Sequence, residues 1–189
     1  MGCNNPSGAD NQQERPCSHN WLDEISDDLG NWVAGFVDGE GSFNVPVRQE
    51  RDRGLPWRVS LCFNVSQIGK EVPSLLRSVF GVGTVRGRGD GVFYYEVTKP
   101  VDLNERVLPF FDRFQLRSTK QKDFLIFCEI TRLVLAKRHL SAAGIEELLK
   151  LRSPMNRGGK RRRSDETILS RLKDWESSEA ICRAPSGEG

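Results

Sequence analysis

Two glycines, four residues apart in an apolar helical pattern, constrain this chain more than any other feature. Between Trp32 and Val37, large apolar side chains recur at the spacing of an amphipathic helix, which we predict over about residues 28–39. Gly35 and Gly39 then lie on one face of that helix, because residues four apart stack. A glycine inside a helix costs about 1 kcal/mol relative to alanine. We therefore expect another backbone to approach this face closely.

Strands are predicted directly after this helix. Apolar and polar residues alternate over 42–48 and again over 58–66, which is typical of strands with one buried and one exposed face. Pro46 has no amide hydrogen, so it favours an edge or a bulge in the first strand. The charged segment 49–56 between them is too long for a tight turn.

The remaining pattern predicts a second helix, a hairpin and several further helices. Gly81 and Gly83 end the second helix, and the hairpin turns at residues 89–91. Ser164 is predicted to cap the last helix, with acidic residues in its first turn. The predicted ranges are 70–80 for the second helix, 84–88 and 92–97 for the hairpin, and 101–114, 119–137 and 141–151 for the next three helices. The order is α-β-β-α-β-β-α followed by extra helices, an α/β chain of the α+β kind.

The distribution of charge points to a polyanionic partner. The 189 residues suffice for one buried core and carry a net charge of +2. Residues 31–163 hold a net +10, whereas the segments on either side are acidic. This pattern suits a phosphate backbone. We expect a flexible polar arm over 1–20, one domain over 21–178 and a flexible tail over 179–189.

Several classes of protein are disfavoured by what the sequence lacks. No apolar run approaches the roughly 20 residues that span a bilayer, and no signal peptide is evident, so no membrane partner is expected. The five cysteines form no CxxC pair, which favours free thiols in a reducing, intracellular compartment. Two isolated histidines and the absence of a P-loop argue against His-metal nucleases and nucleotide-dependent enzymes.

The segment from Trp32 to Phe43, containing AGFVDGEGSF, resembles the LAGLIDADG motif of homing endonucleases. Later stretches resemble the same family: residues 63–67, 80–83, 120–124 and 155–160. Because the motif occurs once, the resemblance implies the single-motif, homodimeric type. It also implies the LAGLIDADG fold, αββαββα with a saddle-shaped antiparallel four-stranded sheet and extra C-terminal helices.

The resemblance implies a catalytic set at the end of the first helix. Glu40 would bind Mg²⁺, or another divalent cation such as Mn²⁺, together with its twofold mate and the backbone carbonyl of Gly39. Gly35, Asp38 and Gly39 would form the dimer interface. Gln67 would hold the nucleophilic water. Lys120 would neutralise charge near the scissile phosphate, with Lys122 as the competing assignment.

The polar faces of the strands are the predicted DNA-binding surface, because antiparallel strands can lie in a major groove. By alternation this surface contains Asn44, Arg48, Arg58, Ser60, Asn64, Arg86, Arg88 and Tyr94. Basic residues near 158–163, including Lys160, Arg161 and Arg162, are predicted to bind phosphates.

These features predict a site-specific, intron-encoded homing endonuclease. Its homodimer would make a double-strand break in a long, near-palindromic DNA site by metal-dependent phosphodiester hydrolysis, in a prokaryotic cytoplasm or an organelle. Two alternatives stay open: an intron maturase that binds the host intron RNA, and a DNA-binding regulator that does not cut. Retention of Glu40, Gln67 and Lys120 together favours the nuclease.

Overall fold

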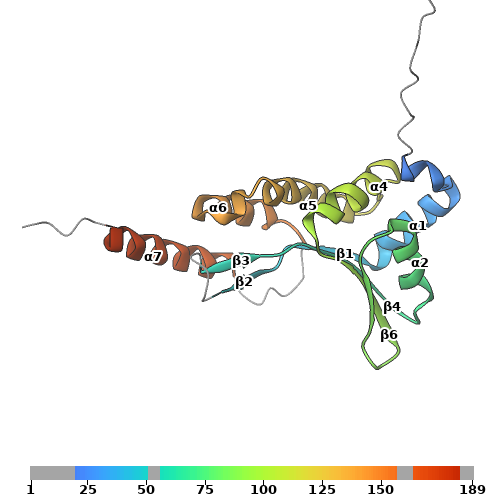
Figure 1. Ribbon diagram of the computed structural model, residues 1–189, viewed down its shortest axis with the longest axis horizontal. Coiled ribbons are helices and arrows are strands. Elements are labelled where there is room, and N and C mark those ends of the chain that lie inside the picture. Colours follow the sequence, from blue (N-terminus) through green and yellow to red (C-terminus); the bar gives the residue numbers. More distant parts are fainter. Residues whose placement is uncertain (1–19, 51–55, 157–163, 184–189) are drawn as a thin grey trace, which may run out of the picture.

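The structure, a computed structural model, describes residues 20–50, 56–156 and 164–183. Its helices α4, α5 and α6 lie along the upper side of the strands in Figure 1, and α1 and α2 pack at one end. The arm over 1–19 and the tail over 184–189 lie outside the described residues, as does part of the predicted charged loop, 51–55.

The element order follows the prediction, except that each of the first two predicted strands is divided in two. Ser26 caps the first helix: its side chain accepts a hydrogen bond from the Leu29 amide, which satisfies a donor that has no partner within the helix. Gly81 ends the second helix in the left-handed conformation, at φ 69°, which glycine adopts without strain. The helices are η1 (Trp21–Glu24), α1 (Asp27–Glu40), α2 (Glu71–Phe80), α3 (Pro100–Asp102), the π-helix η2 (Leu103–Val107), α4 (Leu108–Arg113), α5 (Lys120–Leu135), η3 (Arg138–Leu140), α6 (Ala142–Arg152) and α7 (Asp165–Arg183).

The main sheet is antiparallel and has the strand order β1-β4-β6-β5. Its strands are β1 (Gly41–Asn44), β4 (Cys62–Ile68), β5 (Thr84–Gly87) and β6 (Val92–Val97). The register places Phe43 opposite Phe63 and Val65 opposite Tyr95. These side chains share the face that the helices cover, so the predicted α+β class and four-stranded sheet are confirmed.

Both of the first two predicted strands are broken, which corrects the sequence prediction. The segments beyond the breaks form a separate two-stranded ribbon, β2 (Val47–Gln49) with β3 (Trp57–Val59). Pro46 lies at the first break, where it can donate no ladder hydrogen bond, although its carbonyl accepts one from the Ser60 amide at 2.9 Å. The ribbon extends away from α1, beneath α6 and beside α7 (Figure 1).

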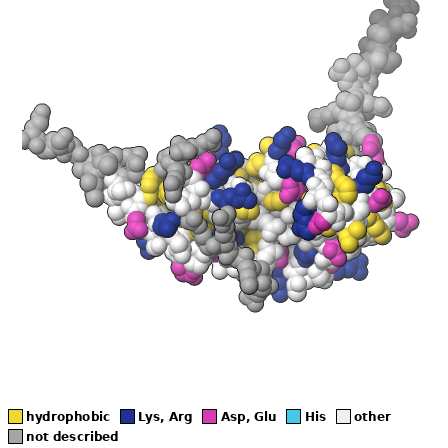
Figure 2. Space-filling model, turned by 90° about the horizontal axis from the view of Figure 1, so that it is seen from below, with side chains coloured by type: hydrophobic (Ala, Val, Ile, Leu, Met, Phe, Trp, Pro, Cys, Tyr) yellow, Lys and Arg dark blue, Asp and Glu magenta, His cyan; other side chains and the backbone are white. Residues whose placement is uncertain are grey.

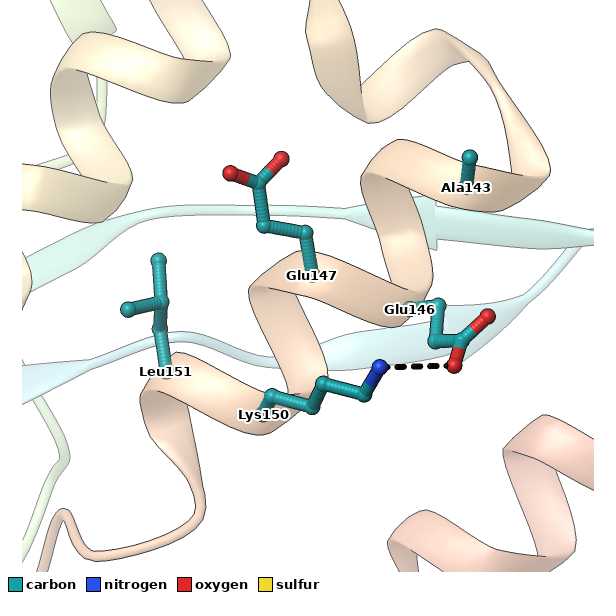
Figure 3. Close-up of a pocket in the computed structure, with 5 residues that line it drawn as sticks. All are labelled: Ala143, Glu146, Glu147, Lys150 and Leu151. Carbon is teal, nitrogen blue, oxygen red and sulfur yellow. Dashed lines mark ion pairs between the residues drawn. The ribbon is translucent and has the colours of Figure 1, made fainter.

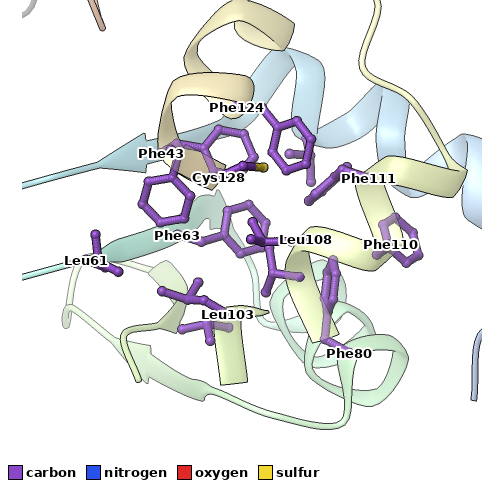
Figure 4. Packing of buried hydrophobic residues seen from close by; sticks show 14 of the residues in the cluster. Phe43, Leu61, Phe63, Phe80, Leu103, Leu108, Phe110, Phe111, Phe124 and Cys128 are labelled. Atoms are coloured by element: carbon purple, nitrogen blue, oxygen red, sulfur yellow. The ribbon is translucent and has the colours of Figure 1, made fainter. Parts of the chain in front are cut away.

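The core between sheet and helices is built from aromatic rings. Phe43 and Phe63 stack at 5.2 Å between ring centroids, and Phe111 meets Phe63 edge to face at 5.7 Å. Phe124 of α5 lies against Phe43 at 5.4 Å. Figure 4 shows these rings between the strands and α4 and α5. Interlocked rings of this kind hold α4 and α5 against the sheet.

A smaller core attaches the C-terminal helices to the ribbon. Trp57 of β3 is buried with Ile145 of α6 and Ile168 of α7. Ser164 accepts a hydrogen bond from the Thr167 amide, so it caps α7 as predicted. The helix itself runs to Arg183, past the domain end expected at residue 178.

The thiols of Cys62 and Cys128 are free, as expected. Among the residues described, no helix is both long enough and apolar enough to cross a membrane.

Candidate active site and nucleic-acid interface

Glu40 is the last residue of α1 and immediately precedes the edge strand β1. Its side chain is exposed. The helix cannot continue through Gly41, which is extended with φ −81° and ψ 163°. The chain therefore turns from helix to strand at the carboxylate and leaves it at the surface.

The ammonium group of Lys120 caps the same end of α1. Its Nζ donates to the carbonyl oxygen of Val37 at 3.0 Å, to that of Gly39 at 3.3 Å and to that of Gly41. A cation is favourable there because the carbonyls at a helix C-terminus carry partial negative charge. The Gly39 carbonyl, expected as a metal ligand, is thus engaged by Lys120 in this chain.

The pKa of Lys120 reflects this half-buried position. Burial lowers it from the ordinary value, and the carboxylates of Asp38, Glu40 and Asp123 oppose that lowering. Lys122 is exposed on the same helix. Of the two lysines left open by the sequence, the structure brings Lys120 to the end of α1.

Asp38, which we expect at the dimer interface, is hydrogen-bonded within its own chain. Its carboxylate accepts hydrogen bonds from the Arg117 amide at 2.9 Å and the Ser118 amide at 2.8 Å. The Ser118 hydroxyl donates a third bond, at 2.6 Å. Asp38 therefore fixes the loop that leads into α5 and, with it, the position of Lys120.

These bonds also govern the charge of Asp38. Burial alone would raise the pKa of its carboxyl group. The hydrogen bonds from Ser118 and Arg117, with the positive charge of Lys120, outweigh burial and lower the pKa below its usual value. The group stays ionised, as a carboxylate acceptor of three donors must.

Gln67 lies near the end of β4, opposite Phe93 of β6. It is two residues beyond Val65, which pairs with Gly41 at the start of β1. Its side chain is half-buried. Because residues two apart on a strand share a face, it points to the same helix-covered side of the sheet as Val65. The register thus brings Gln67 to the end of the sheet at which Glu40 emerges.

Gly35 and Gly39 face open space in the single chain. A Cβ atom built at either position would meet no atom within 4 Å. Nothing within the described chain therefore requires glycine at these two positions. Trp32, on the same exposed side of α1, stacks on Phe36 at 5.4 Å and keeps 46% of its surface accessible.

The register of the main sheet shows which polar side chains share its uncovered face. Asn64 lies opposite both Ser42 and Glu96, and Tyr94 lies opposite both Ser66 and Arg86. Asn44, Asn64, Arg86 and Tyr94 are thus on one face, as predicted. Lys and Arg side chains are spread along the molecule when it is seen from below (Figure 2).

Further residues of this face were not among the predicted DNA contacts: Ser42, Cys62, Ser66, Thr84 and Glu96. Their alternation with the apolar residues was visible, and Glu96 is two residues from Tyr94.

Arg88 reaches Tyr94 across the hairpin. Its guanidinium donates to the Tyr94 hydroxyl at 2.7 Å and forms an ion pair with Asp90. The hydrogen bond to Asp90 and the charge of that carboxylate raise the pKa of Arg88. Arg86 makes no ion pair with any described residue, so its guanidinium is available to a ligand.

Arg48 and Arg58 do not lie on the main sheet, which revises their expected place. They face each other across the ribbon and are exposed. Arg58 lies 3.9 Å from Glu50. Trp57, Val47 and Val59, on the opposite face of the ribbon, pack against α6 and α7. Because side chains alternate between the faces of a strand, both arginines point away from those helices. Ser60 lies at the break between ribbon and main sheet.

The segment carrying Lys160, Arg161 and Arg162 lies outside the described residues, but both of its flanks are held near the strands. Asn156 donates to the Phe43 carbonyl at 2.9 Å. Arg152 donates to the Val45 carbonyl at 2.7 Å and pairs with Asp165 at the start of α7. The two flanks are therefore held against the backbone on either side of Asn44, at Phe43 and Val45.

A shallow hollow on α6 lies apart from these residues. It is lined by Ala143, Glu146, Glu147, Lys150 and Leu151, and the Lys150 ammonium lies 2.9 Å from Glu146 (Figure 3). No residue of the predicted site lines it.

An α+β sheet with a glycine-faced helix ending in an exposed carboxylate defines a LAGLIDADG-type protein. The sequence matches the LAGLIDADG endonuclease family over residues 33–131, more than half of the chain, and the chain therefore belongs to that family.

Individual relatives agree with this assignment. "Probable intron-encoded endonuclease 3" of Neurospora crassa is 31% identical over 132 residues, which is 67% of this chain and 25% of that protein. Homing endonuclease I-ApeII of Aeropyrum pernix is 29% identical over 148 residues, 75% of this chain and 88% of that protein. The chain spans about a quarter of the length of the Neurospora relatives it matches.

Solved structures show the same fold. I-SmaMI bound to an uncleaved DNA target in the presence of calcium ions superposes with a TM-score of 0.68 at 30% identity. The match covers 76% of this chain and 48% of that one.

Proposed function

We propose that this chain is an intron-encoded homing endonuclease whose homodimer binds a long, near-palindromic DNA site and cuts both strands. The observation that carries the proposal is the exposed Glu40 carboxylate at the end of α1, beside the open face of Gly35 and Gly39. If two copies of α1 pack through these glycines, twofold symmetry brings two Glu40 side chains together.

The donor groups at this end of α1 fit a divalent cation in part. Glu40 supplies a hard carboxylate oxygen of the kind that Mg²⁺ and Mn²⁺ prefer. No group of three His, Cys, Asp or Glu side chains in the described chain could hold a metal ion. We infer that the Glu40 side chains of two subunits share the ion, which when bound stabilises the leaving oxygen. The neighbour solved with calcium ions supports a divalent cation at such a site.

The residues around Glu40 have distinct roles in this proposal. Lys120 holds the carbonyls of Val37, Gly39 and Gly41 together, so the last turn of α1 is rigid and Glu40 is held in place. Its positive charge also lies beside the reacting phosphate. Gln67 reaches the same end of the sheet and would orient the attacking water through its side-chain amide.

The uncovered face of the sheet is the proposed DNA surface. Asn44, Asn64, Arg86, Arg88 and Tyr94 offer donors and acceptors to base edges, and Arg48 and Arg58 extend the surface along the ribbon. Ser60 would contribute at the junction. Lys160, Arg161 and Arg162 remain proposed phosphate contacts. We place the protein in a reducing compartment, either a prokaryotic cytoplasm or an organelle, consistent with its intron-encoded relatives.

The test is cleavage of the intronless version of the host locus. The full chain should linearise that DNA with Mg²⁺ and fail to do so with chelator, while the same locus carrying the intron should stay intact. Binding of the intronless DNA without cleavage in Mg²⁺ or Mn²⁺ would support a regulator instead. Tight binding of the intron RNA, with no binding of the DNA, would support a maturase.

A further inference from the structure

We propose that Glu96 reads a cytosine in each half-site, by accepting a hydrogen bond from the cytosine amino group in the major groove. The inference rests on the proposed function, since it assigns a base to a residue of the proposed DNA surface. It adds a specificity-determining residue to that surface.

Glu96 occupies the middle of the uncovered face. It belongs to β6, an interior strand, and lies directly opposite Asn64 of β4 and Thr84 of β5. Tyr94 is its neighbour two residues along the same strand. Asn64 lies opposite Glu96 and Arg86 lies opposite Tyr94, so a ligand that contacts both crosses β6 beside Glu96.

Glu96 forms no ion pair with a lysine or arginine of the described chain, and its side chain is half-buried between two strands. Burial raises the pKa of the Cys62 thiol on the same face to about 11; the negative charge of Glu96 adds to this rise and the positive charge of Arg48 opposes it. Asp90, at the tip of the hairpin, differs because Arg88 neutralises it.

An unpaired carboxylate against DNA needs a hydrogen-bond donor. Phosphates repel it, and guanine presents only acceptors in the major groove. Adenine has an amino group, but the neighbouring N7 is an acceptor and repels a carboxylate. Cytosine presents an amino group and has no major-groove acceptor of its own, so it is the base that a carboxylate favours.

The experiment is selection of bound sequences from a randomised half-site library, using the full-length protein in Ca²⁺ so that binding is measured. Glu96→Gln keeps the shape of the side chain, and its amide can pair with adenine through N6 and N7. We expect wild type to select cytosine at one position of each half-site and the variant to prefer adenine there, a change of about tenfold. Glu129→Gln makes the same change on the exposed side of α5 and should leave every preference unaltered.

The outcomes separate this inference from the proposed function. If wild type selects a defined site and Glu96→Gln keeps the same bases, the role of Glu96 is refuted and the proposed function stands. Uniformly tighter binding by Glu96→Gln would show that the carboxylate faces phosphates, which also refutes it. If wild type enriches no DNA sequence, the proposed function fails and this inference with it.

Discussion

The Nζ atom of Lys120 donates a 3.0 Å hydrogen bond to the carbonyl oxygen of Val37, 83 residues earlier in the chain. The bond joins the start of α5 to the end of α1. Because Gly39 and Gly41 also accept from the same ammonium, all three of its donors are used by backbone carbonyls. Stability and cleavage should therefore both depend on this lysine.

Lys120→Met should lower the free energy of unfolding by about 1–2 kcal/mol, because the carbonyls at the end of α1 lose their charged donor. It should also abolish cleavage. Lys122→Met, on the exposed side of the same helix, should change neither property. Urea unfolding and a plasmid cleavage assay measure the two effects, and loss of cleavage in Lys122→Met alone would reverse the assignment.

Asp38 should make stability depend on acid pH. Its folded-state pKa lies below the ordinary value of 3.8, so the carboxylate stabilises the fold fully above that pH. This contribution is lost as the pH falls through the lowered pKa. Asp38→Asn should cost about 1–2 kcal/mol at neutral pH and flatten the acid limb of a stability–pH curve. Ser118→Ala should give a smaller loss of the same sign, and an unchanged acid limb in Asp38→Asn would contradict the assignment.

Glu40→Gln should abolish cleavage and leave DNA binding and thermal stability near wild type. The side chain is exposed, so the amide should fold equally well, whereas a neutral amide binds a divalent cation poorly. Glu176→Gln on exposed α7 is the matched control. Measurable cutting by Glu40→Gln at saturating Mg²⁺ would rule out Glu40 as the metal ligand.

Gly35→Leu and Gly39→Leu should prevent dimerisation without unfolding the monomer. Added side chains meet nothing within the chain, but they would hold two α1 helices apart. Gly30→Ala is the contrasting variant, since its Cβ would come within 2.3 Å of the Phe114 ring and should destabilise the monomer itself. Sedimentation and circular dichroism distinguish the two effects; a dimer that persists in both leucine variants places the interface elsewhere.

Arg86→Ala should relax base preference at a few positions in both half-sites, at a cost of about 1–3 kcal/mol against the preferred base. Arg88→Ala should do the same at neighbouring positions. Asp90→Asn should reproduce part of the Arg88 effect, because Asp90 orients that guanidinium. Arg132→Ala on exposed α5 is the control, and a cleavage profile over a substrate library is the measurement. Equal loss on all sequences would make both arginines phosphate contacts.

Local patterns in the sequence determined most of the elements and their order. The spacing of apolar residues predicts α1 and α2, alternation predicts the strands, and Gly81 and Ser164 mark helix ends. These features depend on neighbouring residues, so a single sequence contains them. The glycine pair and Glu40 were visible for the same reason.

Tertiary structure decided which distant residues meet. Alternation assigns a face to Glu96 and Asn64, but only strand register places them opposite each other. Nothing local indicates that Asp38 binds the loop at Ser118, or that Lys120 caps α1. The separate ribbon could not be predicted either. Pro46 cannot donate a backbone hydrogen bond, but this alone does not determine whether the strand bulges or breaks. Such contacts join residues that are far apart in the chain, and the packing of the aromatic core sets where they meet.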